Sequence, residues 1–278
     1  MKPIAQQTIL VTGATDGLGK QTALALARQG ATVLLHGRDP QRLATTLREI
    51  EEATGNARLE TYLADFAQLA AVRSMAETLQ VRHPRLDMLI NNAGIGGGKQ
   101  GEARRELSAD GYELRFAVNY LAPFLLTHLL LPCLRQAVPA RIINVASVGQ
   151  AAIDFRDVML ERHYNPMDAY RQSKLALVMF TFDLAEALKD EHITVNCLHP
   201  ATFMNTKMVY ESVGYTLSTV EEGLQAVLYL ATSPELDTVT GQYFDQLRKA
   251  RAHRQAYDRE ARRQLRQLSE QLCSLIQS

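Results

Sequence analysis

The sequence predicts an α/β fold in which helices cover both faces of a parallel, doubly wound sheet. Short apolar runs of strand length alternate with longer helix-like segments from the N-terminus to about residue 244. The runs are apolar at nearly every position, so each strand is expected to be buried on both faces, as in parallel sheets. A chain of 278 residues can bury the core of such a domain. We expect one domain over residues 1–244 and a helical extension over residues 245–278.

Each strand is predicted from an apolar run that ends at glycine or at a polar residue. The first run contains Ile9, Leu10 and Val11 and leads directly into a glycine-rich turn. The expected strands, in chain order, lie at 8–12, 31–36, 58–63, 86–91, 141–146, 193–198 and 241–244.

Helices are predicted between the strands. The first follows Gly19, contains the strong helix formers of residues 23–27 and stops at Gly30. The others are expected at 40–54, 69–81, 110–136, 168–189 and 220–232. Residues 206–219 have no firm periodicity, so this segment is expected to be a mobile lid or an ordinary surface loop.

The turn after the first strand carries glycines at positions 13, 17 and 19. Glycine lets the backbone come close to a diphosphate, and the unpaired N–H groups at the start of the next helix attract an anion. The strand, turn and helix together predict a site for an anionic cofactor. The alternative is an ordinary tight turn.

The end of the second strand is where folds of this class bind the adenosine ribose of a dinucleotide. An acidic residue there accepts hydrogen bonds from the ribose hydroxyls, whereas an arginine accommodates a 2′-phosphate. Gly37 is followed by Arg38, which favours NADP over NAD. The alternative is that Arg38 is a solvated charge and that Asp39 binds the ribose.

The stretch from Ser147 to Lys174 contains the candidate catalytic residues. Tyr170 and Lys174 are four residues apart, so on a helix they share one face. A neighbouring ammonium lowers the pKa of a tyrosine and brings proton transfer closer to neutral pH. Ser147 follows a predicted strand and could hold a substrate oxygen. The alternative is a surface tyrosine and lysine on an amphipathic helix.

Composition argues against several kinds of partner. Thirty basic and thirty acidic residues cancel, so no overall charge draws the protein to nucleic acid or to an anionic membrane. The three cysteines (Cys133, Cys197 and Cys273) are far apart and odd in number, which is typical of reduced thiols in a cytoplasmic protein rather than of disulfides or metal ligands. No signal-like segment is seen, and the apolar run 121–138 is short and interrupted. Neither secretion nor a membrane span is therefore expected.

The tail from Asp245 is rich in arginine, and apolar residues recur at spacings of three and four from Tyr257 to Leu275. This pattern predicts one amphipathic helix with a narrow apolar seam. The helix is expected to pack on its own domain or on a partner subunit. Binding to an anionic membrane is the alternative.

Five motifs occur in the order and context of the short-chain dehydrogenase/reductase family. They are the turn Thr12–Gly19, the run 91–94 (Asn-Asn-Ala-Gly), Asn119, Ser147, and Tyr170-x-x-x-Lys174. Together they cover nearly the whole chain up to Phe244. The chain is similar in sequence to the retinol dehydrogenase-like branch in segments 117–127, 153–155 and 173–176. The long insertion between Ser147 and Tyr170 also resembles that branch.

The resemblance implies a Rossmann fold of seven parallel strands, with the active site at their carboxyl ends. It also implies a catalytic tetrad. Tyr170 would exchange the proton of an alcohol or carbonyl, and Ser147 would bind that oxygen. Lys174 would lower the pKa of Tyr170 and hold the nicotinamide ribose, and Asn119 would order a water relay. Hydride transfer at the nicotinamide would then interconvert the alcohol and the carbonyl.

The resemblance also implies a set of cofactor contacts. Besides Arg38, Tyr170 and Lys174, the residues expected to contact the cofactor are Gly13, Asp16, Gly17, Leu18, Gly19, Asp65, Phe66, Asn92, Ala93, Gly94, Pro200 and Thr202.

Two departures from the family pattern limit this transfer. The chain has Pro200-Ala201 where the family usually has Pro-Gly, and the threonine that follows in the family is here Asn205 or is shifted to Thr206. The nicotinamide end is therefore expected to be held differently. The branch often carries an N-terminal membrane anchor that this sequence does not show, so retinoid specificity is not inherited.

The sequence supports two hypotheses about function. The first is a cytoplasmic oxidoreductase that prefers NADP(H) over NAD(H) and acts on a small, fairly apolar carbonyl or alcohol. The second is a cofactor-binding regulator or scaffold without turnover. The presence of all four tetrad residues favours the first. A homodimer or homotetramer is expected, because the helices at 110–136 and 168–189 are apolar on more than one face and the family usually pairs through them.

Overall fold

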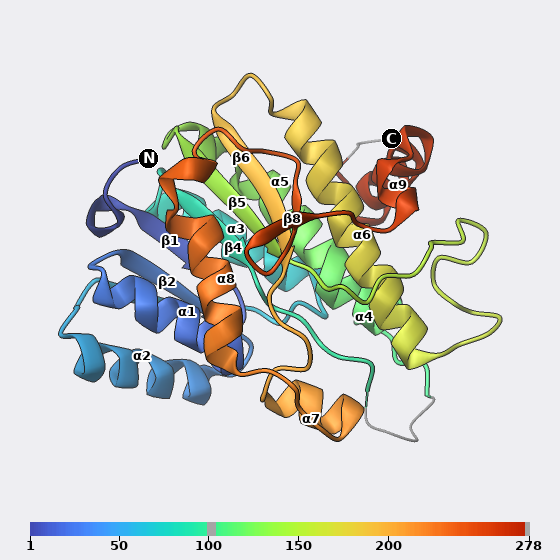
Figure 1. Ribbon diagram of the computed structural model, residues 1–278, viewed down its shortest axis with the longest axis horizontal. Helices are drawn as coiled ribbons and strands as arrows, with labels where there is room; N and C mark the ends of the chain where they lie inside the picture. Colours follow the sequence, from blue (N-terminus) through green and yellow to red (C-terminus); the bar gives the residue numbers. More distant parts are fainter. Residues whose placement is uncertain (99–103, 276–278) are drawn as a thin grey trace.

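The computed structural model describes residues 1–98 and 104–275, which form an eight-stranded sheet in the order β3-β2-β1-β4-β5-β6-β7-β8 (Figure 1). The strands are β1 (Thr8–Val11), β2 (Thr32–Gly37), β3 (Leu59–Leu63), β4 (Met88–Asn91), β5 (Ala140–Val145), β6 (Ile193–His199), β7 (Tyr243–Asp245) and β8 (Arg248–Ala250). The first seven are parallel, which confirms the predicted sheet, and β8 is antiparallel to β7. The strand order reverses between β1 and β4, where ligands bind in such sheets.

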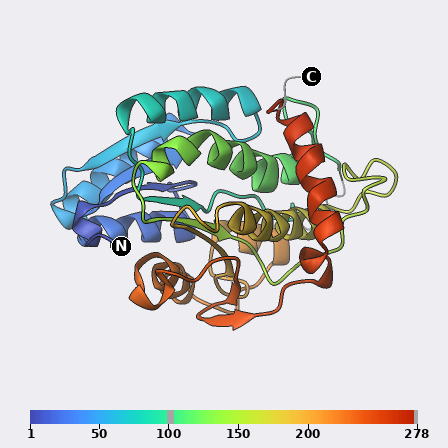
Figure 2. The same cartoon turned by 90° about the horizontal axis from the view of Figure 1, so that it is seen from above.

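Helices cover both faces of the sheet (Figures 1 and 2). One layer consists of α1 (Gly17–Arg28), α2 (Pro40–Thr54) and α8 (Val220–Thr232), and the other of α3 (Leu69–Arg82), α5 (Ala122–Arg135) and α6 (Pro166–Ala187). Side chains alternate across each strand, so Ile9 and Val11 belong to the first core and Leu10 to the second. Burial on both faces explains why the strands read as continuous apolar runs.

Two segments differ from the sequence-based expectation. The helix expected over 110–136 begins only at Leu114 and contains α4 (Leu114–Phe116), a π-helical turn η2 (Ala117–Leu121) and α5. The segment expected to be a loop or lid contains a helix, α7 (Lys207–Val213), which Thr206 caps and Gly214 ends with a φ of 85°. A helix of seven residues is too short to show a clear periodicity.

The tail was expected to be one helix, but it contains β8, a 3-10 turn η4 (Arg254–Tyr257) and α9 (Arg259–Leu272). Its first residues pair with β7 and add the eighth strand that the sequence did not predict. Asp258 starts α9 by accepting hydrogen bonds from the next two free N–H groups. The expectation that the tail packs on its own domain is confirmed, because Arg266 pairs with Asp183 of α6 at 3.2 Å. The division of the chain at residue 244 stays a prediction.

Helix α9 lies across the helices that were expected to pair with another subunit (Figure 2). Tyr120 and Ser269 join it to η2 by a hydrogen bond of 2.6 Å between their hydroxyl oxygens. Within residues 1–98 and 104–275, no large hydrophobic side chain of α5 or α6 is exposed. Residues Leu114–Arg135 are long and apolar enough to cross a membrane, but 83% of their most apolar window is buried in the protein. Self-association through these helices stays a prediction.

Candidate active site

The four tetrad residues meet at the carboxyl ends of β4 and β5. Ser147 lies two residues after β5, and Asn119 lies in the π-helical turn η2. Tyr170 and Lys174 lie in the first half of α6, whose start is set by Asn165. The Asn165 side chain accepts hydrogen bonds from the N–H groups of residues 167 and 168, and a proline at the first helical position strengthens this start. The helix therefore holds the tyrosine and lysine on one face, as predicted from their spacing.

Lys174 is a buried cation next to the candidate tyrosine. Its Nζ donates a hydrogen bond of 2.9 Å to the carbonyl oxygen of Val145 at the end of β5. The same Nζ lies 5.9 Å from the centre of the Tyr170 ring. Burial lowers the pKa of Lys174 to about 8. The lysine can therefore gain or lose its proton near physiological pH.

Tyr170 differs from the expectation in one respect. Burial raises the pKa of Tyr170, and the Ser147 hydroxyl acts in the opposite direction. The upward direction arises because removing the phenol from water disfavours the charged phenolate. A lowering by Lys174 was expected, but the lowering contribution in this structure comes from Ser147 and burial outweighs it. The Tyr170 hydroxyl is therefore protonated at neutral pH.

Asn119 is fully buried and its amide is held by protein atoms. Its Oδ1 accepts a hydrogen bond of 2.8 Å from the N–H of Ile95, and its Nδ2 donates to the carbonyl oxygen of Ile95 and to the Ser173 hydroxyl, both at 3.0 Å. These bonds tie the loop after β4 to α6. A structural role for Asn119 is thus visible, and the water relay remains a proposal.

The glycine turn packs too closely against neighbouring backbone to accept a side chain at Gly13 or Gly19. Gly13 has a φ of 66°, and a Cβ atom there would lie 2.8 Å from the Cα of Ala93. A Cβ atom at Gly19 would overlap the carbonyl oxygen of Gly13. The turn ends at the N-terminus of α1, where Asp16 caps the helix by accepting a hydrogen bond of 2.8 Å from Gly17. The turn therefore leads directly into a helix N-terminus, which is where anionic groups bind.

The loop after β4 braces this turn. Thr12 Oγ1 accepts hydrogen bonds from the N–H groups of Asn92 and Ala93 at 2.9 and 3.0 Å. Asn92 Nδ2 donates to the carbonyl oxygen of Thr12 at 2.9 Å. Gly94 lies against the tetrad, because a Cβ atom there would lie 3.1 Å from Asn119 Oδ1 and 3.4 Å from Lys174 Nζ. The structure thus brings the predicted residues 92–94 against both the glycine turn and the tetrad.

His36 was missed in the sequence and supports the same turn. This buried side chain at the end of β2 accepts a hydrogen bond of 3.1 Å at Nδ1 from the N–H of Gly13. Its Nε2 lies 3.1 Å from the carbonyl oxygen of Ala64, and its ring stacks on Phe66 with centres 4.2 Å apart. Burial lowers the pKa of His36 to about 4, so the ring is neutral near pH 7. A single titratable residue at the end of an apolar run was the signal that could have revealed it.

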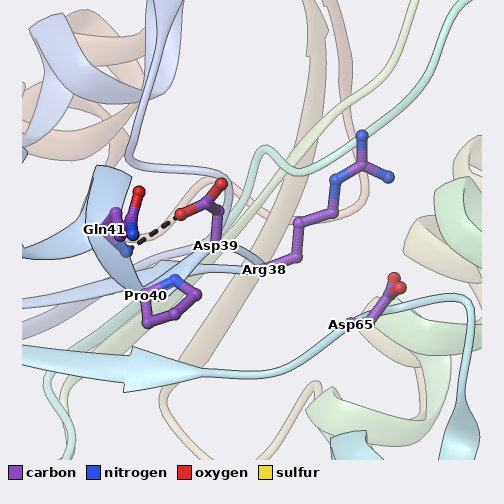
Figure 3. A pocket seen from close by; sticks show the side chains of 5 residues that line it. All are labelled: Arg38, Asp39, Pro40, Gln41 and Asp65. Atoms are coloured by element: carbon purple, nitrogen blue, oxygen red, sulfur yellow. Dashed lines mark hydrogen bonds between the residues drawn. The ribbon is translucent and has the colours of Figure 1, made fainter.

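Arg38 lies in an open pocket of about 470 Å³ together with Asp39, Pro40, Gln41 and Asp65 (Figure 3). Asp39 caps α2, because its Oδ1 accepts hydrogen bonds of 2.9 and 3.0 Å from the next free N–H groups. Arg38 is exposed and extends away from this cap (Figure 3). The carboxylate oxygen that caps the helix is thus already bonded, whereas Arg38 lines the open pocket.

The remaining predicted contacts lie at the rim of the same sheet edge. Leu18 is buried in the first turn of α1. Pro200 follows β6, and Thr202 Oγ1 lies 3.0 Å from Nε2 of His199. The two candidates for the family's threonine take part in different helix starts. Asn205 Oδ1 accepts a hydrogen bond of 2.8 Å from the N–H of Val220, so it helps to start α8.

Thr206 caps α7, and its methyl group would lie 3.2 Å from a Cβ atom at Gly17. Of the two candidates for the family's threonine, Thr206 is the one that lies beside the glycine turn.

Comparisons with known proteins identify the family to which the chain belongs. The family profile described as short chain dehydrogenase matches residues 7–214. Retinol dehydrogenase 13 of Homo sapiens is 37% identical over 94% of this chain and 83% of its own length. The structure of a short chain dehydrogenase from Escherichia coli complexed with NADPH superposes with a TM-score of 0.71 and 28% identity, covering 87% of this chain and 97% of that one. A 3-ketoacyl-(acyl-carrier-protein) reductase from Brucella melitensis complexed with NADH gives a TM-score of 0.70 and 25% identity, covering 87% of this chain and 97% of that one.

The glycine turn at the start of α1, the tetrad beside it and the match of the family profile lead to one assignment. The chain is a short-chain dehydrogenase/reductase of the retinol dehydrogenase-like branch, with a site for a nicotinamide cofactor.

Proposed function

We propose that the protein interconverts a ketone or aldehyde and the corresponding alcohol with NADP(H), and that Tyr170 is the general acid and base. The observation that carries this proposal is the meeting of Tyr170, Ser147 and Lys174 at one end of β5. The Ser147 hydroxyl is close enough to that of Tyr170 to lower the pKa of the tyrosine through a hydrogen bond. A substrate oxygen beside this pair would meet two hydroxyl groups.

Each side chain has a distinct role in this proposal. The nicotinamide cofactor, when bound, supplies or accepts the hydride. Ser147 would donate a hydrogen bond to the substrate oxygen, and Tyr170 would give that oxygen its proton during reduction or take it during oxidation. Lys174 would keep positive charge beside the phenol as the proton leaves, because its pKa of about 8 leaves it largely protonated near pH 7.

Preference for NADP(H) is part of the proposal. Arg38 is exposed at the edge of the pocket after β2, and a guanidinium there suits a 2′-phosphate. Asp39, the alternative ribose ligand, uses Oδ1 to cap α2. These two observations support the phosphorylated cofactor.

The substrate is proposed to be small and fairly apolar, and the compartment to be the cytoplasm. Support for the substrate class comes from the similarity to retinol dehydrogenase 13, whose name gives an apolar alcohol as its substrate. Support for the compartment comes from the three cysteines, which are free and buried.

Replacement of Tyr170 by Phe tests the proposal. We expect turnover of apolar aldehydes and ketones to fall by about a hundredfold or more, while NADPH binding stays within roughly twofold of wild type. Both quantities can be followed by the fluorescence of NADPH itself, which is needed because the chain has no tryptophan to serve as an energy-transfer donor. Substantial turnover by this variant would refute the role of Tyr170. Tight NADPH binding by a wild-type protein that turns over none of a broad substrate panel would favour the scaffold hypothesis.

A further inference from the structure

We propose that Gln255, in the C-terminal tail, is a positioning residue for Ser147 that acts through the backbone of residues 147–153. The inference rests on the proposed function, in which Ser147 binds the substrate oxygen. The sequence predicts only that the tail is an amphipathic helix that packs on its own domain or on a partner subunit, with binding to an anionic membrane as the alternative. In the structure, its turn η4 lies against the segment that follows the candidate catalytic serine.

The amide of Gln255 pairs with one backbone residue in both directions. Its Oε1 accepts a hydrogen bond of 2.7 Å from the N–H of Ile153, and its Nε2 donates one of 3.0 Å to the carbonyl oxygen of Ile153. A side-chain amide that satisfies both polar groups of a residue replaces the pairing that a neighbouring strand would give. The Ile153 side chain is buried, so the pair lies at the edge of the core.

A second link connects the tail to Ser147 itself. The N–H of His253 donates a hydrogen bond of 2.8 Å to Oε1 of Gln150, and Nε2 of Gln150 donates one of 2.8 Å to the carbonyl oxygen of Ser147. The Tyr243 hydroxyl of β7 donates to the same carbonyl oxygen at 3.2 Å. The backbone of Ser147 is therefore held by β7 and, through Gln150, by the tail.

The opposite side of the segment contacts α6 and the serine hydroxyl. The N–H of Ala151 donates a hydrogen bond of 3.3 Å to the carbonyl oxygen of Arg171, the residue after Tyr170. The N–H of Gly149 donates one of 3.0 Å to Oγ of Ser147, which orients the hydroxyl. The segment thus lies between the helix that carries Tyr170 and the tail that carries Gln255. Releasing the tail would let the serine shift relative to the tyrosine.

Two substitutions at Gln255 test this role. Gln255→Ala removes both hydrogen bonds to Ile153, and Gln255→Glu keeps the acceptor but places a carboxylate oxygen against the Ile153 carbonyl. We expect Gln255→Ala, which removes the acceptor, to speed hydrogen exchange at the Ile153 amide. We also expect kcat/KM for an apolar aldehyde to fall by between about tenfold and about a hundredfold, mainly in kcat, because small misplacements of catalytic groups are costly.

NADPH affinity separates positioning from a general loss of structure. The glycine turn and Arg38 follow β1 and β2, whereas the tail attaches beside β5 to β7, so we expect NADPH affinity to stay within roughly twofold of wild type. The matched control is Gln264→Glu on α9, an exposed position where the same chemical change should leave exchange and turnover unaltered.

The inference is overturned if exchange at Ile153 and kcat match wild type in both variants. It is also overturned if NADPH affinity and turnover fall together, since that pattern shows a merely structural role. Failure of the proposed function would look different. The wild-type protein would then bind NADPH without turnover, and exchange at Ile153 would still decide whether Gln255 holds this segment.

Discussion

Lowering the pH from about 7 to about 5 should destabilise the protein through His36. The ring is buried and neutral, its Nδ1 accepts a hydrogen bond from Gly13, and its Nε2 faces the carbonyl oxygen of Ala64. A proton on Nδ1 would remove the acceptor for Gly13 and bring charge into the core. The burial that lowers the pKa of His36 to about 4 is thus also a penalty on the protonated form.

The protein loses stability as the pH falls because the unfolded state binds a proton at His36 more readily than the folded state does. The pKa of His36 is about 4 in the folded state, and that of an unfolded histidine is about 6.5. Between these values the unfolded chain binds a proton that the folded chain does not, so stability is retained above about pH 6.5 and is lost as the pH falls towards 4. For one group with these pKa values, the loss between pH 7 and pH 5 is about 2 kcal/mol.

Urea unfolding of wild type and of His36→Asn at several pH values measures this loss. Asparagine does not titrate, and its Oδ1 can accept the Gly13 hydrogen bond in place of Nδ1. We expect the variant to lose about 2 kcal/mol less than wild type between pH 7 and pH 5. Burial also lowers the pKa of His128 and of His199, so both proteins should lose some stability and only the difference reports on His36. Parallel curves for the two proteins would refute the reasoning.

Three further predictions concern the cofactor site and the tail. Gly19→Ala should weaken NADPH binding by about tenfold or more, because its Cβ atom would overlap the Gly13 carbonyl oxygen; unchanged affinity in a fluorescence titration would show that the turn can open without cost. Arg38→Ala should weaken NADPH binding by about tenfold while leaving NADH binding nearly unchanged, and equal losses would move the ribose contact to another residue. Arg266→Asp should lower the free energy of unfolding by about 1 kcal/mol, because the new carboxylate faces Asp183. Adding Asp183→Arg should restore most of that loss in the same denaturation assay, and no restoration would mean that the ion pair does not hold α9.

Local patterns in the sequence were enough to predict the sheet, the glycine turn and the helix that carries Tyr170 and Lys174. Strands buried on both faces must be apolar throughout, and the spacing of four places the two side chains on one helical face by geometry alone. These features depend on residues that are close together in the chain. They could therefore be read before any contact between distant segments was known.

The tertiary structure decided what depends on distant residues. The direction of the Tyr170 pKa was predicted to be downward, because the sequence shows a lysine nearby but not how much water surrounds the phenol. His36 reads as part of an apolar strand, and only the fold brings Gly13 to its Nδ1. Gln255 lies 102 positions from Ile153, so no local pattern could connect them. Burial and pairing between distant segments arise only when the chain has folded, and here they determine how the site is supported.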